Sequence, residues 1–162
     1  MRSRRTIIGV IGAGTCDAPV SFAAFAVGKA LALRGCILIT GGRSGVMKAA
    51  SEGAASAGGL VIGILPGESP DEANEFVDVP VVTGLGEARN VIIARTADGL
   101  IAITGEYGTL SEIAFGLKFG KPVVSLNSWS VDARIQQASS PEDAVNRVLA
   151  ALDTRENTGA AP

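Results

Sequence analysis

Histidine is absent from this 162-residue sequence. Without histidine there can be no Ser-His-Asp triad, no Cys-His pair and no histidine-ligated zinc site. Any general acid–base chemistry must use Asp, Glu, Lys, Tyr or Cys side chains. The two cysteines, Cys16 and Cys36, are too few for a metal cluster or a disulfide framework. We therefore expect no metal site and a reducing compartment.

Aromatic residues and excess positive charge are also scarce. Aromatic residues make up 4% of the chain, and 14 basic residues face 16 acidic ones, for a net charge of −2. Nucleic-acid binding usually needs a basic surface or an aromatic platform, so it is disfavoured. Lys29 and Arg34 interrupt the best apolar stretch before it reaches the ~18 residues of a membrane span. We expect a cytoplasmic protein with neither a nucleic-acid nor a membrane partner.

The chain length fits one domain. The most prominent feature of the sequence is a series of short apolar runs. These runs lack polar alternation, as expected for strands buried on both faces of a parallel sheet. Pro80 lies in the fourth run, which suggests an edge strand or a strand start. The predicted strands are residues 6–11, 36–40, 61–65, 79–83, 100–103 and 123–126.

Helical patterns alternate with these strands. Asp17 is a plausible N-cap, Pro19 suits a first turn and Gly35 fits a C-cap position. Ser140 and Asp143 have the spacing of a capping box. The predicted helices are residues 18–33, 46–57, 87–97, 110–119 and 141–152. This order predicts a single α/β, doubly wound Rossmann-like domain with a mostly parallel sheet of six or seven strands. We place the domain at residues 6–152, between a basic tail (1–5) and a disordered tail (153–162).

Glycine-rich turns follow three of the predicted strands, at residues 12–15, 41–45 and 105–109. Glycine lets the backbone approach an anion closely, and a helix N-terminus directs N–H groups toward it. Because the carboxyl ends of parallel strands share one edge, these turns predict a site for a phosphate-bearing small molecule. The predicted ligand-binding residues are Gly12, Gly14, Thr15, Gly41, Gly42, Arg43, Ser44, Gly45, Gly105, Glu106, Tyr107, Gly108 and Thr109.

The standard phosphate-binding motifs do not fit. The first turn has Asp17 where the dinucleotide fingerprint has its third glycine, and the second strand ends in Thr40 rather than an acidic residue. NAD binding is therefore disfavoured. The chain also has no G-x-x-x-x-G-K-[ST] segment, which excludes a P-loop NTPase.

Residues 105–112 read Gly-Glu-Tyr-Gly-Thr-Leu-Ser-Glu. This segment is similar to the Pro-Gly-Gly-x-Gly-Thr-x-x-Glu motif of the LOG-like Rossmann superfamily. That superfamily includes the cytokinin riboside 5′-monophosphate phosphoribohydrolases once named lysine decarboxylases. Arg89 precedes Glu112 by 23 residues, where the family carries its catalytic arginine, and residues 41–47 resemble its second glycine loop. The resemblance covers residues 6–127 and implies catalytic roles for Arg89 and Glu112.

A second resemblance falls within the same superfamily. Residues 41–47, 62–67 and 78–86 resemble the molybdenum cofactor carrier branch and its bacterial relatives. For that branch the implied role is to bind and protect a phosphate-bearing pterin cofactor. Relatives of this fold form dimers or tetramers, so the resemblance also implies a homo-oligomer.

Three positions depart from the hydrolase pattern. Glu106 replaces the second glycine of the motif, Thr104 replaces its proline, and Asn90 replaces the lysine that usually follows the catalytic arginine. Glu106 is either a group that selects the ligand or an exposed turn residue. Tyr107 either lines a pocket or packs as a ring.

The candidate catalytic residues also have simpler interpretations. Glu112 and Thr109 have capping-box spacing, in which Thr109 is an N-cap and Glu112 only satisfies backbone N–H groups. Arg89 could form a helix salt bridge with Glu87, and Arg43 could be an exposed turn residue. Both sets of roles stay open at this point.

The sequence favours two alternative functions. The first is a carrier or sensor that binds a nucleotide or a molybdopterin-type cofactor without converting it. The second is a phosphoribohydrolase that releases base and ribose 5-phosphate from nucleoside 5′-monophosphates, and it requires no cofactor. In the second function Gly105, Gly108 and Thr109 hold the phosphate, while Arg89 and Glu112 act at the glycosidic bond.

Overall fold

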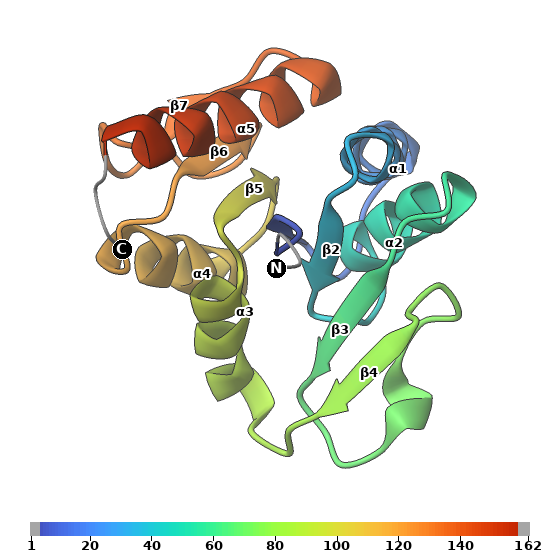
Figure 1. The fold of residues 1–162 in the computed structure, drawn as a ribbon. Helices are drawn as coiled ribbons and strands as arrows, with labels where there is room; N and C mark the ends of the chain where they lie inside the picture. The colour runs from blue at the N-terminus through green and yellow to red at the C-terminus, as the bar shows by residue number, and fades with distance from the viewer. Residues whose placement is uncertain (1–3, 159–162) are drawn as a thin grey trace.

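The structure, a computed structural model, describes residues 4–158, with side chains described up to residue 155. Seven strands form one parallel sheet in the order β4-β3-β2-β1-β5-β6-β7 (Figure 1). Their bounds are β1 Ile7–Gly12, β2 Ile37–Thr40, β3 Val61–Leu65, β4 Val79–Val82, β5 Gly99–Ile103, β6 Val123–Leu126 and β7 Gln136–Gln137. The predicted Rossmann-like α/β fold is confirmed.

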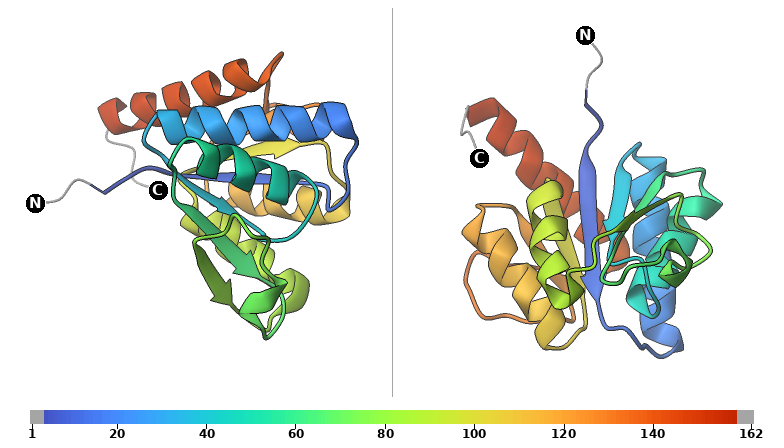
Figure 2. Two further views of the ribbon diagram at one scale, coloured as in Figure 1. Left: turned by 90° about the vertical axis from the view of Figure 1, so that its right-hand side faces the viewer. Right: turned by 90° about the horizontal axis from the view of Figure 1, so that it is seen from below.

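Helices cover both faces of the sheet (Figure 2). Helices α1 (Ala18–Leu33), α2 (Val46–Ser56) and α5 (Pro141–Thr158) pack on one face. Helices α3 (Asn90–Thr96) and α4 (Tyr107–Lys118) pack on the other. Two short 3-10 helices, η1 (Pro70–Glu72) and η2 (Gly86–Arg89), lie in the loops on either side of β4. The apolar residues of the central strands are thus buried from two sides, which accounts for their lack of polar alternation, whereas the residues of the edge strand β4 are exposed.

The strand order reverses at β1, where strands added later in the chain begin to extend the sheet on the opposite side. From β1 the chain passes to β2 on one side, and it later returns to place β5 on the other side. The loops that leave the carboxyl ends of β1 and β5 therefore run to opposite faces. In open α/β sheets this arrangement leaves a crevice where ligands bind.

Local sequence signals set the ends of the first and last helices. The Asp17 carboxylate accepts a hydrogen bond from the Val20 N–H (3.0 Å), and Gly35 follows α1 with φ = 75°. Ser140 Oγ accepts from the Asp143 N–H at 3.1 Å, as the capping box predicts. The edge position predicted from Pro80 is also confirmed, because β4 ends the sheet.

Several predicted elements differ from the structure. The helix expected at 87–97 is divided into η2 and α3, and α4 begins at Tyr107, three residues earlier than expected. Strand β7 was missed because its two glutamines carry no apolar signal. Helix α5 continues to Thr158, beyond its predicted end at residue 152, and Arg155 donates a hydrogen bond to the Gly120 carbonyl. Residues 1–3 and 159–162 of the predicted tails lie outside the described residues. In the described part, no helix has the length and apolar character to cross a membrane.

Helices α1 and α2 touch backbone to backbone. A Cβ added at Gly28 would collide with the carbonyl oxygen of Ala50, and one added at Gly53 would collide with the carbonyl oxygen of Phe25. The glycines thus let α1 and α2 lie in close contact with each other on the same face of the sheet.

We predict that Gly28→Ala lowers the unfolding free energy by about 2–3 kcal/mol, because the two helices must separate to admit the methyl group. Urea denaturation measures this loss. Gly14→Ala is the control, since a Cβ there meets nothing within 4 Å, and its effect should stay within about 0.5 kcal/mol. Equal midpoints for the two variants would contradict the backbone contact.

Candidate functional site

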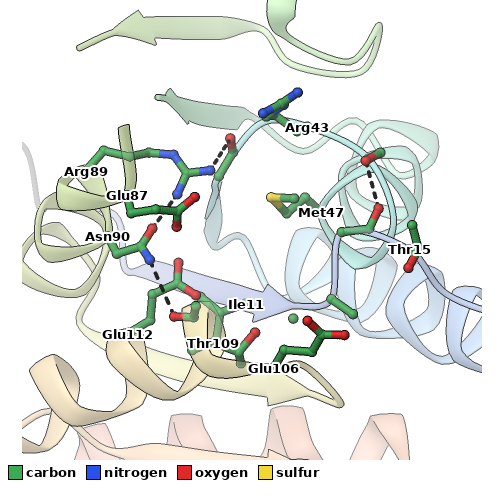
Figure 3. A pocket seen from close by; sticks show the side chains of 16 residues that line it. Ile11, Thr15, Arg43, Met47, Glu87, Arg89, Asn90, Glu106, Thr109 and Glu112 are labelled. Carbon is green, nitrogen blue, oxygen red and sulfur yellow. Dashed lines mark hydrogen bonds between the residues drawn. The ribbon is translucent and has the colours of Figure 1, made fainter. Parts of the chain in front are cut away.

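A cavity of about 570 Å³ opens at the carboxyl edge of the sheet, between the loops that follow β1, β2 and β5 (Figure 3). Its volume is typical of small-molecule sites. It is lined by Ile11, Gly12, Ala13, Gly14, Thr15, Gly41, Arg43, Ser44, Met47, Glu87, Arg89, Asn90, Glu106, Gly108, Thr109 and Glu112. The cavity therefore lies at the topological switch point, where the fold favours binding.

The first and second glycine loops are tied together. The Val46 N–H donates a hydrogen bond to the Ala13 carbonyl (2.9 Å), and Ser44 Oγ donates to the Gly14 carbonyl (2.8 Å). Gly45 has φ = 64°, and a Cβ there would collide with the Ala13 oxygen. These contacts fix one wall of the cavity before any ligand binds.

The third loop is held in an unusual backbone conformation. Thr104 has φ = 50°, which is rare for a β-branched residue, and Gly105 has φ = 102°. Ser128 Oγ donates to the Thr104 carbonyl, and Trp129 Nε1 donates to the Glu106 carbonyl at 3.1 Å. The strained turn therefore places Glu106 at the start of α4. No side chain caps α4, so the N–H groups of its first turn stay available.

Arg89, at the end of η2, is buried in the cavity wall with only 7% of its surface exposed. Its guanidinium donates to the Asn90 side-chain oxygen and, over 3.5 Å, to the Gly41 carbonyl. Its Nε–H has no hydrogen-bond partner among the residues that the structure describes. Among the described side chains, no carboxylate lies within the 4.0 Å of an ion pair with Arg89. Burial lowers the pKa of Arg89, and the charges of Glu112 and Glu87 oppose that shift.

Glu112, in the second turn of α4, is equally buried. Removal from water raises the pKa of this carboxyl to about 8, although Arg89 acts to lower it and Glu87 to raise it further. At neutral pH the side chain is therefore largely a neutral carboxylic acid, which can donate as well as accept a hydrogen bond.

Asn90 links Arg89 to α4. Its oxygen accepts from Arg89, and its Nδ2 donates to Ser111 Oγ at 3.0 Å and to the Gly108 carbonyl at 3.4 Å. Ser111 Oγ in turn donates to the Gly108 carbonyl at 2.6 Å. Sequence reasoning missed this network, because it depends on the packing of α3 against α4. It also missed the cavity-lining Met47.

Most of the predicted site residues line the one cavity. They are Gly12, Gly14, Thr15, Gly41, Arg43, Ser44, Arg89, Glu106, Gly108, Thr109 and Glu112. The structure places Gly42, Gly45, Gly105 and Tyr107 outside the lining. Gly42 and Gly45 shape the second loop, and Gly105 packs against the Thr109 side chain. Tyr107 is 80% exposed, with its ring 5.8 Å from that of Trp129.

The simpler interpretations of Glu112, Thr109 and Arg89 are wrong. Because α4 begins at Tyr107, Thr109 lies inside the first turn and is not an N-cap, and Glu112 caps nothing. Arg89 forms no salt bridge with Glu87. Within the described residues, no three acidic or cysteine side chains are grouped to hold a metal ion.

Comparison with known proteins places the chain in a family. The family model described as the SLOG cluster4 family matches residues 5–155. The chain belongs to the SLOG cluster4 family. An uncharacterized protein of Archaeoglobus fulgidus is 49% identical over 139 residues, which cover 86% of this chain and 91% of that protein.

The superfamily and carrier-like resemblances are also confirmed. The cytokinin riboside 5′-monophosphate phosphoribohydrolase LOG of Oryza sativa is 33% identical over 83% of this SLOG chain, which spans 62% of that protein. The molybdenum cofactor binding protein of the phototrophic bacterium Rippkaea orientalis superposes with a TM-score of 0.88 at 39% identity. The molybdenum cofactor carrier protein of Chlamydomonas reinhardtii gives 0.86 at 40% identity. Both superpositions cover 93% of this chain and 99% of the other.

We predict that Glu112→Gln changes how the stability of this SLOG protein depends on pH. The native carboxyl has a pKa of about 8 against an ordinary value of 4.5, so the folded state binds the proton more tightly. The unfolding free energy of the wild type should therefore fall as pH rises from about 5 to above 8.

The variant should lack this decline and exceed the wild type by on the order of 1–3 kcal/mol above pH 8. Chemical denaturation at pH 5, 7 and 9 measures the difference. Glu68→Gln, on an exposed loop residue, should keep the wild-type slope. A Glu112→Gln slope equal to that of the wild type would show that the native carboxyl is ionised at neutral pH.

Proposed function

We propose that this protein binds a phosphate-bearing small molecule, either a nucleotide or a molybdopterin-type cofactor, and acts as a carrier or sensor. The observation that carries the proposal is Arg89, a buried guanidinium that faces a cavity and has no ion-pair partner among the described side chains. Burying an unpaired charge costs several kcal/mol, so buried charges are normally compensated. An anionic ligand group would supply the missing counter-charge.

A second arginine supports the same ligand class. Arg43 extends over the cavity from the loop after β2, and no carboxylate of the described residues pairs with it (Figure 3). A planar guanidinium donates parallel N–H groups that match phosphate oxygens. Because Glu112 is mostly neutral at pH 7, it does not cancel these charges.

The known relatives favour the carrier role. Proteins described as molybdenum cofactor carrier or binding proteins match this chain along almost its whole length. We infer that the protein acts in the cytoplasm as a homo-oligomer, either a dimer or a tetramer. Exposed apolar side chains on α1, Phe22 and Leu33, and on β4, Val79 and Val82, support the assembly.

We predict that Arg89→Met reduces the affinity for nucleoside monophosphates about tenfold to a hundredfold, because a charge-assisted phosphate contact is lost. Isothermal titration calorimetry with GMP and ribose 5-phosphate measures the affinity. The same variant should unfold at a higher temperature in the absence of ligand, since an unpaired buried charge has been removed.

Arg95→Met is the matched control. Arg95 lies on α3 with its guanidinium 3.6 Å from the centre of the Phe119 ring and does not line the cavity. Its affinity should equal that of the wild type. Unchanged binding by Arg89→Met would assign the anion to another part of the protein, and failure of the wild type to bind any monophosphate would refute the proposed function.

A second candidate function is the hydrolysis of nucleoside 5′-monophosphates to base and ribose 5-phosphate. It is favoured by the raised pKa of Glu112, which supplies a proton donor at neutral pH beside Arg89. In this reaction Glu112 would protonate the base as its bond to the anomeric carbon of the ribose breaks, water would add to that carbon, and the proton that the water loses would restore the Glu112 carboxylic acid. Gly108 and Thr109, which line the cavity, would then hold the phosphate.

Release of ribose 5-phosphate from a panel of monophosphates, including N6-substituted AMP, separates the two functions. For a carrier, we predict no release at high enzyme concentration. For a hydrolase, the wild type releases ribose 5-phosphate, and Glu112→Gln abolishes turnover but retains binding. Turnover that survives this substitution would exclude Glu112 as the proton donor.

A further inference from the structure

We propose that Glu106 selects the heterocycle of the ligand, and that this heterocycle carries a ring N–H beside an exocyclic amino group. The 2-amino-4-oxopyrimidine ring, shared by guanine and pterins, has this edge. The proposal rests on the proposed function, because it assigns the end of the ligand that lies away from the phosphate.

Besides Glu87 and the mostly neutral Glu112, the cavity lining has one more acidic side chain, Glu106. Its carboxylate lines the cavity, yet its oxygens have no hydrogen-bond or ion-pair partner among the described residues. In Figure 3, Glu106 lies across the cavity from Arg43, whereas Glu87 lies next to Arg89. The site thus has a cationic end and a separate carboxylate end.

Hydrogen bonds from two side chains fix the backbone around Glu106, although Glu106 itself is exposed. Trp129 donates to its carbonyl, and Ser128 fixes the strained Thr104 two residues earlier. Strain of this kind persists only where the surroundings enforce it, and it is concentrated at functional sites. The position at the N-terminus of α4 also favours a negative charge on the side chain.

These features determine what the carboxylate can recognise. A phosphate dianion beside Glu106 would be repelled, so the phosphate belongs near Arg43 and Arg89. An ionised carboxylate only accepts hydrogen bonds, and its two oxygens fit two parallel N–H donors. Guanine and pterin rings offer that pair. Hypoxanthine offers only the ring N–H, and adenine places an unprotonated ring nitrogen beside its amino group.

The test compares GMP with IMP, which differ only in the 2-amino group, by calorimetry at constant ionic strength. We expect the wild type to bind GMP about tenfold more tightly than IMP, since one charge-assisted hydrogen bond is lost. In Glu106→Gln this preference should fall to about twofold, with IMP affinity unchanged or increased. Glu68→Gln, away from the cavity, should keep the full preference.

Each outcome has a distinct meaning. Equal binding of GMP and IMP by the wild type overturns the selectivity proposal and leaves the phosphate site standing. A GMP preference that persists in Glu106→Gln places the selective group elsewhere and also overturns it. No binding of GMP, IMP or ribose 5-phosphate refutes the proposed function itself. The comparison on the wild type does not depend on the folding of any variant.

Discussion

The buried guanidinium of Arg89 is the interaction on which the site depends. It lies between the end of β2, where it contacts the Gly41 carbonyl, and α4, which it reaches through Asn90. The two segments belong to opposite sides of the topological switch point. A charge held in this way without an ion pair is costly, and in the proposed function an anionic ligand would compensate that cost. The same burial keeps Glu112 largely neutral, so the arginine is not neutralised from within.

The rest of the fold keeps that cavity open and shaped in advance. The first two loops are joined by hydrogen bonds from Val46 and Ser44, and the third is fixed by Ser128 and Trp129. Close packing of α1 on α2 at Gly28 and Gly53 holds α2, the helix that follows the second loop, against α1. A preformed site spends little binding free energy on ordering its own loops, which suits a carrier that must hold a small ligand.

Sequence patterns predicted the fold well, because its central strands are buried on both faces and its first and last helices have clear caps. The same patterns predicted that the three glycine loops lie at one edge of the sheet, because the carboxyl ends of parallel strands meet at the same edge. Where prediction failed, distant contacts decided the outcome. Thr109 and Glu112 have the spacing of a capping box, but the Gly105–Glu106 turn starts the helix earlier and turns Glu112 into the cavity wall. The bond from Asn90 to Ser111 depends on how α3 packs on α4, which local patterns do not contain.

The most direct measurement is a crystal structure of the protein with GMP bound. We predict that the phosphate lies within hydrogen-bond distance of the Arg89 guanidinium, with the guanine ring directed toward Glu106. A structure in which the ligand lies outside this cavity, or in which Arg89 turns to pair with Glu87 while the phosphate lies elsewhere, would contradict the role assigned to the buried charge.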